Sequence, residues 1–451
     1  MRKLAAGIIL LLLSGMITGC DRKETRDSYI EGTDFQYQYA SPNTFINTIA
    51  QGKGCTYFIV GSYIYQMDEE SEIMTPLCNK SNCLHDKERD KNRMADCNAF
   101  LTSDDAGISY MDGFLYFVGK EWVENDLCDV LYKISADGST REKLYQWNGE
   151  IVESWCMHRN VLYCLEHTFD EDNQESYKIK SLELRGMGKA KMKTIYEPDE
   201  NITVFAFGVL KAYGNHLYFN VHGANTKKTD KISDEDWERY TYHKALQYNI
   251  SDGTVSEIRV PKQSDTETVS DITFWQDKLL FHAMDDTKSH QYESKSDVYL
   301  AELDGTNATI FMEDMPSYRW YSSDGTYLYV SDCPEALDRI YHSSDYQYNI
   351  NQGIKVKHDF TVNIDVYDKN KELVDRMKSP IKDFPTELPY GIGNRMYALQ
   401  YNETGNGCNI VYWDKTKLGT YKGKEYTFKK LSEQKYSSYD LQMMEESNGE
   451  G

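Results

Sequence analysis

The stretch Met111–Gly119, MDGFLYFVG, joins a turn pair, Asp112-Gly113, to a Leu-Tyr-aromatic run of the kind that forms a β-strand. Phrases of the same form return along the whole chain. They are GKGCTYFIVG from Gly52, HRNVLYCLE from His158, YGNHLYFNV from Tyr213, WQDKLLFHA from Trp275, SDGTYLYVS from Ser323 and IGNRMYALQ from Ile392. The stretch is therefore one copy of a unit that occurs seven times.

After a variable gap, each phrase is followed by a second alternating run that ends in a turn. Asp-Gly pairs at 137–138, 252–253 and 304–305 mark three of these turns, and this dipeptide between alternating runs is the strongest short hairpin signal. Each unit then reads as four antiparallel strands. Four-stranded units of this length in a row predict an all-β fold, a single β-propeller over residues 50–432 with seven blades, six or eight being the neighbouring counts.

The repeats resemble the TolB-like and low-density-lipoprotein-receptor-like propellers of bacterial surface lipoproteins. They are more similar still to a set of propeller lipoproteins from anaerobic Gram-positive bacteria, which carry a Leu-Cys-x4-Cys-Leu-His phrase after the first blade. Here that phrase begins at Leu77 and is completed by Cys97-Asn98-Ala99. The resemblance covers about residues 50–432, and it implies a fold and a cell-surface location but no activity.

The first twenty residues, MRKLAAGIILLLLSGMITGC, have the form of an export signal. The apolar run is shorter than the roughly 20 residues that a membrane span requires. The sequence Ile17-Thr18-Gly19-Cys20 resembles the bacterial lipobox. We therefore expect a signal peptide at residues 1–19, a lipid on Cys20, a tether over residues 20–49, and an extracytoplasmic protein anchored to the outer face of the cell membrane.

The chain is strongly acidic, with 72 acidic and 50 basic residues and a formal net charge of −22. This balance argues against nucleic acid as a partner, because nucleic-acid binding requires clustered cations. It also argues against electrostatic adhesion to anionic lipid, so membrane contact is expected through the lipid alone. Residues 433–451 are expected to form an acidic, disordered tail.

The gaps between the two phrases of each unit are long and irregular, and the propeller topology places them on one face. Long loops on a rigid scaffold are where binding residues concentrate. Aromatic and histidine side chains in these gaps suit a glycan, a peptide or a partner protein. The ligand-face candidates are Trp122, Trp237, Tyr240, His243, His282, Tyr341 and His342.

Four potential metal ligands, Cys78, Cys83, His85 and Cys97, lie within twenty residues of one another. Three thiolates and an imidazole can hold a tetrahedral zinc ion. Outside the cytoplasm the same cysteines can instead form a disulfide. Either role is structural, and the connection between blades one and two is expected to place the cluster on the same face as the long gaps.

The sequence contains no Gly-x-Ser-x-Gly, His-Glu-x-x-His or phosphate-loop motif. A binding or scaffolding module is therefore the first hypothesis. The alternative is an extracellular hydrolase or lyase with a carboxylate site at the mouth of the central channel. Two carboxylates about 5–10 Å apart, one with a raised pKa, would favour that alternative.

Overall fold

The computed structural model of the chain describes residues 26–30, 33–34, 48–102, 107–124, 126–169, 175–184, 191–199, 203–225, 241–259, 267–285, 295–316, 321–332, 363–378, 390–401, 406–420, 428–437 and 439–441. The expected signal peptide, its Cys20 and four ligand-face candidates lie outside these residues; the four are Trp237, Tyr240, Tyr341 and His342. Within the described part of the chain, no helix has the length and apolar character needed to cross a bilayer.

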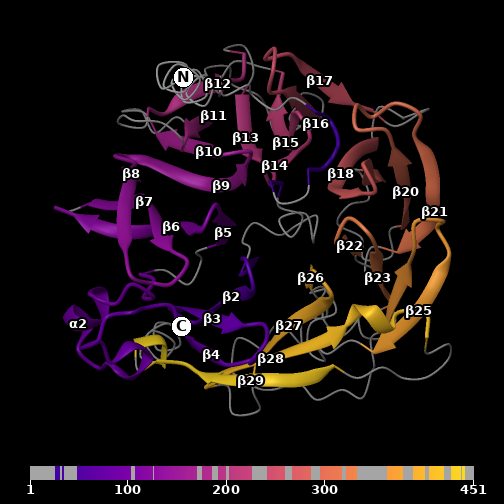
Figure 1. Cartoon of the computed structure of the whole chain (residues 1–451). Coiled ribbons are helices and arrows are strands. Elements are labelled where there is room, and N and C mark those ends of the chain that lie inside the picture. Colours follow the sequence, from indigo (N-terminus) through magenta and orange to yellow (C-terminus); the bar gives the residue numbers. More distant parts are fainter. Residues whose placement is uncertain are drawn as a thin grey trace, which may run out of the picture.

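Seven antiparallel sheets stand in a ring, each made of strands that follow one another in the chain (Figure 1). The predicted seven-bladed β-propeller is thereby confirmed. Blade 1 contains β1 (Ile49–Gln51), β2 (Cys55–Val60), β3 (Tyr63–Asp68) and β4 (Met74–Pro76); blade 2, β5 (Ile108–Met111), β6 (Phe114–Val123), β7 (Asp126–Ser135) and β8 (Arg141–Gln146); blade 3, β9 (Glu150–His158), β10 (Val161–Phe169), β11 (Glu175–Glu183) and β12 (Lys193–Tyr196). Blade 4 contains β13 (Thr203–Phe207), β14 (Lys211–Tyr213), β15 (His216–Ala224), β16 (Thr241–Asn249) and β17 (Val255–Ile258); blade 5, β18 (Glu267–Trp275), β19 (Lys278–Asp285), β20 (Lys295–Ala301) and β21 (Thr309–Pro316); blade 6, β22 (Tyr321–Ser323), β23 (Leu328–Asp332), β24 (Asn363–Tyr367) and β25 (Leu373–Lys378); blade 7, β26 (Tyr390–Ile392), β27 (Arg395–Tyr401), β28 (Gly407–Asp414) and β29 (Lys429–Lys435). Three short helices complete the described elements, η2 (His85–Lys87), α2 (Lys91–Ala95) and η3 (Lys415–Lys417).

The second strand of each blade is the repeated Leu-Tyr phrase. Both faces of this strand pack against neighbouring blades, and all six residues of β2 are buried. Its tyrosines reach across the seam to the next blade: the Tyr57 hydroxyl donates to the Ala136 carbonyl at 3.0 Å, and the Tyr218 hydroxyl to the Leu303 carbonyl at 2.9 Å. A tyrosine side chain can fill an apolar seam with its aromatic ring, while its hydroxyl binds a turn carbonyl. This accounts for the many tyrosines of this chain.

Among the described strands, β26 to β29 of blade 7 are consecutive in the chain, and blades 7 and 1 meet through side-chain contacts. Phe58 meets Tyr397 edge to face at 5.3 Å, and a carboxylate oxygen of Asp440 accepts a hydrogen bond from the Ser62 amide at 2.8 Å. Asp440 is only 6 % exposed, and β29 continues to Lys435. The last blade and its closing contact thus extend past residue 432, where the sequence placed the end of the propeller.

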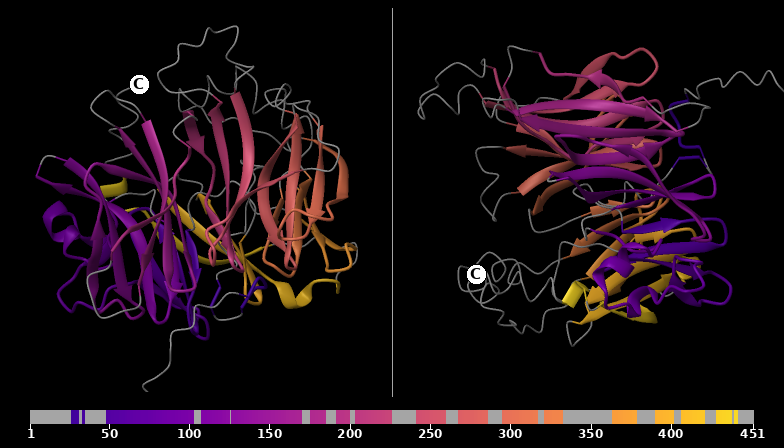
Figure 2. Two further views of the ribbon diagram at one scale, coloured as in Figure 1. Left: turned by 90° about the horizontal axis from the view of Figure 1, so that it is seen from above. Right: turned by 90° about the vertical axis from the view of Figure 1, so that its left-hand side faces the viewer.

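The blades give the ring two different faces, which Figure 2 shows from the side. The turn face carries the connections between first and second strands and between third and fourth strands, among them Asp112–Gly113, Asp137–Gly138, Arg159–Asn160, Gly214–Asn215, Asp252–Gly253, Gln276–Asp277 and Asp304–Gly305. The hairpin face carries the connections between second and third strands. Several gaps that were expected to be loops on this face are partly strand instead. For example, β6 and β7 stay paired in one register up to Val123 and Asp126.

Candidate metal centre and interblade pocket

The four predicted metal ligands converge. One ligand atom from each of Cys78, Cys83, His85 and Cys97 lies within 4.8 Å of all the others. The Sγ atom of Cys97 is 3.7 Å from Nδ1 of His85, close to the edge of about 3.6 Å that a tetrahedron with ordinary zinc bond lengths requires. All three thiols are free.

The loop that carries the ligands is held by capping interactions rather than by a core of its own. Asp90 caps α2 by accepting a hydrogen bond from the Asn92 amide, and the Met94 side chain of α2 is buried in the core shared by blades 1 and 2. The Tyr63 hydroxyl donates to the carbonyl of His85, whose φ is +53°. A non-glycine residue in this left-handed region is uncommon, and here it directs the imidazole toward the thiols.

The surroundings shift the pKa values of the Cys97 and Cys78 thiols in opposite directions. Burial raises the pKa of Cys97. For Cys78, burial also acts to raise the pKa, but hydrogen bonds from the backbone amides of Lys80 and Asn98 and from the Cys97 and Cys83 thiols outweigh it, and the pKa is lowered. Burial lowers the pKa of His85, which favours the neutral imidazole that binds metals. A thiol whose pKa is lowered by backbone amides, beside an imidazole whose pKa is also lowered, is a suitable start for a metal site.

The cluster lies in the seam between blades 1 and 2, against the turn after β7. The carbonyl of Gly138 accepts hydrogen bonds from the Asn79 amide at 3.1 Å and from the Asn98 side chain at 2.8 Å. A Cβ at Gly138 would lie 2.6 Å from the Leu77 carbonyl carbon, so only glycine permits this approach. The same loop also stays beside the β2–β3 hairpin of blade 1, where the Leu77 amide donates to the Ile64 carbonyl and the Leu101 amide to the Ser62 carbonyl. The cluster therefore lies in the seam between that hairpin and the turn after β7.

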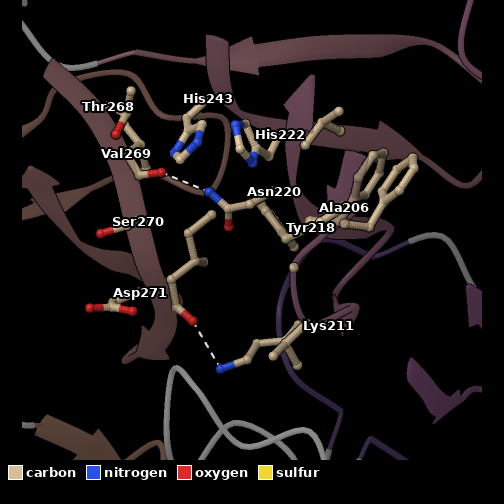
Figure 3. A pocket seen from close by; sticks show the side chains of 16 residues that line it. Ala206, Lys211, Tyr218, Asn220, His222, His243, Thr268, Val269, Ser270 and Asp271 are labelled. Atoms are coloured by element: carbon tan, nitrogen blue, oxygen red, sulfur yellow. Dashed lines mark hydrogen bonds between the residues drawn. The ribbon is translucent and has the colours of Figure 1, made fainter. Parts of the chain in front are cut away.

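A second feature is a cavity of about 280 Å³ between blades 4 and 5 (Figure 3). It forms where the first strand of blade 4 is broken into β13 and β14, with Gly208–Leu210 between them. The side-chain amide of Asn220, on β15, reaches across the seam and donates to the Val269 carbonyl of β18 at 2.7 Å. The cavity is thus walled by two adjacent blades and fixed by a hydrogen bond between them.

A β-bulge in β18 builds the floor of this cavity. The pairing with β19 shifts between Ser270 and Thr273, and Asp271 has a φ of +53°. The bulge turns two successive carbonyls in different directions: that of Asp271 accepts from the Tyr321 hydroxyl of blade 6, and that of Ile272 accepts from the Lys211 ammonium of blade 4 at 2.9 Å. Bulges often redirect backbone groups in this way, and here three blades are joined at one point.

Lys211 is 2 % exposed, and burial lowers its pKa to about 7, against a partial opposing effect of the Asp271 carboxylate. The lysine therefore lies close to its titration point at neutral pH. The sequence analysis missed this residue. The only signal is a single cation, VLKAY, in a short run that is otherwise apolar and directly precedes the Tyr213-Gly214 turn.

Three of the predicted ligand-face residues lie in the described part of the chain, and each has a different environment. His243 is exposed and pairs with His222 across β15 and β16, their rings 4.0 Å apart at the wall of the cavity. Trp122, in blade 2, is 70 % exposed on the β6–β7 hairpin. His282 is 5 % exposed, stacks on Tyr321 and bonds to the Ser296 hydroxyl, so its placement on an exposed loop is wrong. The alternation of β19 points it into the seam between blades 5 and 6.

The carboxyl groups of the described residues whose pKa values are shifted are all shifted downward. Asp137 is the clearest, because hydrogen bonds from Ser135 and Ser139 lower its pKa to about 2. Asp252 and Asp304 are lowered in the same way by the threonine two residues later. These are turn carboxylates, and the raised pKa that would favour a glycosidase-like pair does not occur among the shifted groups.

No protein-family model matches the chain, and no curated protein matches it. Among solved structures it is similar to puromycin hydrolase, at 11% identity and a TM-score of 0.49, over 92% of this chain and 57% of that one, so it spans little more than half of that enzyme. It is also similar to oligogalacturonate lyase from Vibrio parahaemolyticus, at 12% identity and a TM-score of 0.42, over 87% and 91% of the two chains. A third is the β-propeller domain of the trilobed protease from Pyrococcus furiosus, at 14% identity and a TM-score of 0.40, over 68% and 83%. The chain is a β-propeller protein, and similarities this low carry nothing about its activity.

Proposed function

We propose that the protein is an extracytoplasmic, lipid-anchored β-propeller of the TolB-like lipoprotein kind that acts as a binding module. Its ligand is a glycan, a peptide or a segment of a partner protein, taken up from the hairpin face. The sequence from Met1 to Cys20 supports the anchor, and the net charge of −22 supports a partner other than nucleic acid.

The observation that carries this proposal is the cavity between blades 4 and 5, which has the His222–His243 pair at its wall. Its volume is at the lower end of the roughly 300–1,000 Å³ typical of ligand pockets, which suits one sugar ring or one peptide side chain. Polar residues from both blades line it, Asn220 and Lys211 from blade 4 and Thr268 and Ser270 from blade 5. The cavity combines a rigid scaffold with the few polar groups that give a binding site its specificity.

A glycan and peptide array screened with the mature domain tests this function. Ligands found on the array should bind the His243→Ala variant at least about tenfold more weakly, a loss of about 1.4 kcal/mol. Lys53→Ala is the matched control, since Lys53 is exposed in a turn of blade 1 on the turn face. Equal affinity of the His243→Ala variant and the parent would place binding elsewhere.

For the cysteine cluster, we propose a structural zinc ion held by Cys78, Cys83, His85 and Cys97. The convergence of four ligand atoms supports the metal over a disulfide, because a disulfide needs only two of them and leaves the histidine unused. With four protein ligands the ion has no open position, so its role is to fix the loop. Elemental analysis of the purified protein should find zinc, and a chelator but not a reductant should make the loop sensitive to protease.

The alternative, an extracellular hydrolase or lyase, has no specific observation in its favour among the described residues. Its test is direct. Hydrolysis or elimination of an array ligand by the mature domain, abolished by substitution of one carboxylate, would replace the binding module with an enzyme.

A further inference from the structure

An N-terminal strap, residues 26–30 and 33–34, lies across the turn face instead of hanging free as a tether. In the side view of Figure 2 this indigo segment runs along one face of the ring. It contacts the turns between first and second strands of three successive blades: Arg159–Asn160 of blade 3, Gly214–Asn215 of blade 4 and Gln276–Asp277 of blade 5.

Arg159 forms the main attachment. It occupies a two-residue turn in which both residues have positive φ, and its guanidinium binds the Asp34 carboxylate through two hydrogen bonds of 3.0 and 3.1 Å. The same guanidinium donates to the carbonyls of Arg26 and Ser28 at 2.8 and 3.1 Å. Asp34 is only 4 % exposed. A forked, buried pair of this kind fixes orientation as well as distance.

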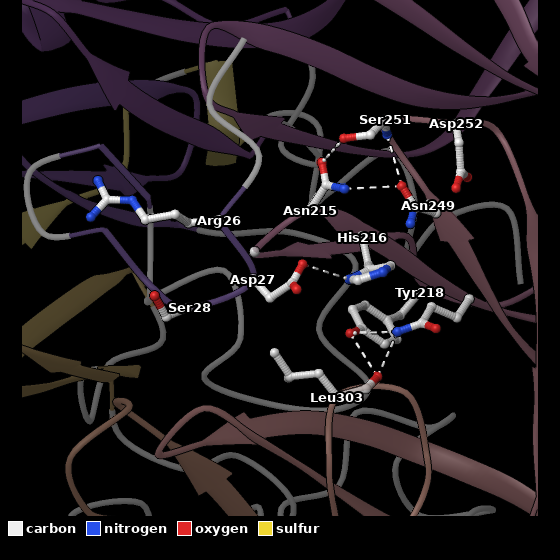
Figure 4. Close-up of polar contacts among 12 residues, drawn as sticks. Arg26, Asp27, Ser28, Asn215, His216, Tyr218, Asn249, Ser251, Asp252 and Leu303 are labelled. Carbon is white, nitrogen blue, oxygen red and sulfur yellow. Dashed lines mark hydrogen bonds and ion pairs between the residues drawn. The ribbon is translucent and has the colours of Figure 1, made fainter.

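The rest of the strap fits closely against blades 4 and 5. The Tyr29 amide donates to the Asp277 carboxylate at 3.1 Å, and the Tyr29 ring stacks on Tyr213 at 6.5 Å. Figure 4 shows the Asp27 carboxylate directed at His216, 3.7 Å away. A Cβ at Gly214 would lie 1.9 Å from the Asp27 carbonyl oxygen, so the backbone of the strap rests directly on this glycine.

From this attachment, and resting on the proposed lipid anchor at Cys20, we infer that the turn face of blades 3 to 5 faces the bilayer and that the hairpin face is held away from it. Arg26 is six residues after Cys20. Six residues span at most about 20–22 Å whatever their path. The ten residues of β6 cross the ring over about 30 Å, so a lipid on Cys20 cannot reach the hairpin face.

The acidity of the turn face is compatible with this orientation. Asp137, Asp252 and Asp304 lie in its turns, and they would be repelled by anionic headgroups at close range. Screening limits that repulsion to about 8 Å at physiological ionic strength, and a spacer that can extend to about 20 Å is long enough for the face to stay beyond it. The bilayer is therefore reached by the lipid, while the ring stands off at a set orientation.

The test uses the full-length lipidated protein in vesicles that contain a headgroup-linked quencher. A fluorophore is attached at Val255→Cys, a 42 % exposed position beside the Asp252–Gly253 turn of blade 4, or at Leu127→Cys, a 50 % exposed position on the β6–β7 hairpin. Labelling of the parent chain gives the background from native thiols. We expect quenching at residue 255 to exceed quenching at residue 127 severalfold, and equal or reversed quenching would overturn the inference.

Two variants separate the strap from the anchor. Arg159→Gln should reduce the difference in quenching between the two labelled positions, while the protein still sediments with the vesicles. A flexible insertion of about twelve residues after Thr25 should do the same because it lengthens the reach of the spacer. An unchanged difference in both variants would show that the strap does not set the orientation. A parent chain that fails to sediment would instead overturn the lipid anchor, and with it the premise of this inference.

Discussion

The seam between blades 1 and 2 and the seam between blades 4 and 5 are closed by different means. In the first, an inserted loop of polar residues fills the seam and is tied down by Cys78, Cys83, His85 and Cys97. In the second, the described backbone itself departs from regularity through the β18 bulge and the break before Lys211. The first seam is packed around a ligand cluster, whereas the second retains a cavity.

The difference shows how the seam between two repeated units can acquire either an inserted loop or a cavity. An insertion adds polar groups that can satisfy one another within the seam, as the four side chains of the cysteine cluster do by converging. A bulge redirects groups that were already there, and the buried lysine it binds has a pKa near 7, at a cost in stability. Four substitutions test this contrast, and they are given from the largest expected effect on stability to the smallest.

Cys97→Ser should have the largest effect, because it removes a buried ligand from the cluster. We expect loss of bound zinc and a fall in the free energy of unfolding on the order of 5 kcal/mol. Elemental analysis and urea unfolding measure the two results. Cys128→Ser, which changes a buried thiol outside the cluster, is the control and should cost about 1 kcal/mol with the metal retained. Equal costs would mean that the cluster holds no metal.

Lys211→Met should change how stability depends on pH. The pKa of Lys211 is about 7 in the folded chain and 10.5 ordinarily, so between these values the unfolded chain binds the proton and the folded chain does not. Stability contributed by this site therefore rises from pH 7 to pH 10, by about 3 kcal/mol, and is lowest at and below pH 7. Urea unfolding at a series of pH values should show the rise in the parent and not in the variant. Parallel curves for the two proteins would contradict the buried, neutral lysine.

Tyr321→Phe should weaken the second seam without opening it. The substitution removes the hydrogen bond to the Asp271 carbonyl at the bulge and leaves a buried acceptor, at a cost of about 1–2 kcal/mol. Hydrogen exchange of the amides around residues 269–273 should become faster. Tyr412→Phe in blade 7 is the comparison, and faster exchange in both variants would point to a general loss of stability.

Trp122→Ala should have the smallest effect on folding, within about 0.5 kcal/mol, because the side chain is 70 % exposed. If the hairpin face of blade 2 takes part in recognition, binding of array ligands should fall while the melting temperature stays the same. A large drop in melting temperature would show that Trp122 packs in a way that its exposure does not indicate.

The repeat and the cluster could be predicted because both are local in sequence. Each blade pairs strands that are neighbours in the chain, so the Leu-Tyr phrase and the Asp-Gly turn together define it. The four candidate ligands lie within twenty residues and needed only a compact loop to meet. Which part of blade 2 this loop contacts could not be predicted, since it depends on the hydrogen bonds that the Gly138 carbonyl accepts from Asn79 and Asn98.

The second seam and the strap could not be predicted because they depend on distant pairs. The run SDITFWQD looks like an unbroken strand, and only its partners Tyr321 and Lys211 explain why it bulges at Asp271. Residues 26–34 have the composition of a linker, yet Asp34 finds its partner Arg159 more than a hundred positions away. His282 was misplaced for a related reason, as strand β19 extends further than its phrase suggested.

The pairing of consecutive strands within each described blade has a consequence for the order of folding. In the described part of the chain, every blade is complete once its own four or five strands have left the ribosome or a translocation channel. Pairing over short sequence separations is fast and limits the exposure of open strand edges. Contacts between blades 7 and 1, such as those of Phe58 with Tyr397 and of Asp440 with the Ser62 amide, join the two ends of the ring. The newly made blades can therefore assemble in sequence, and the ring closes when blade 7 docks on blade 1.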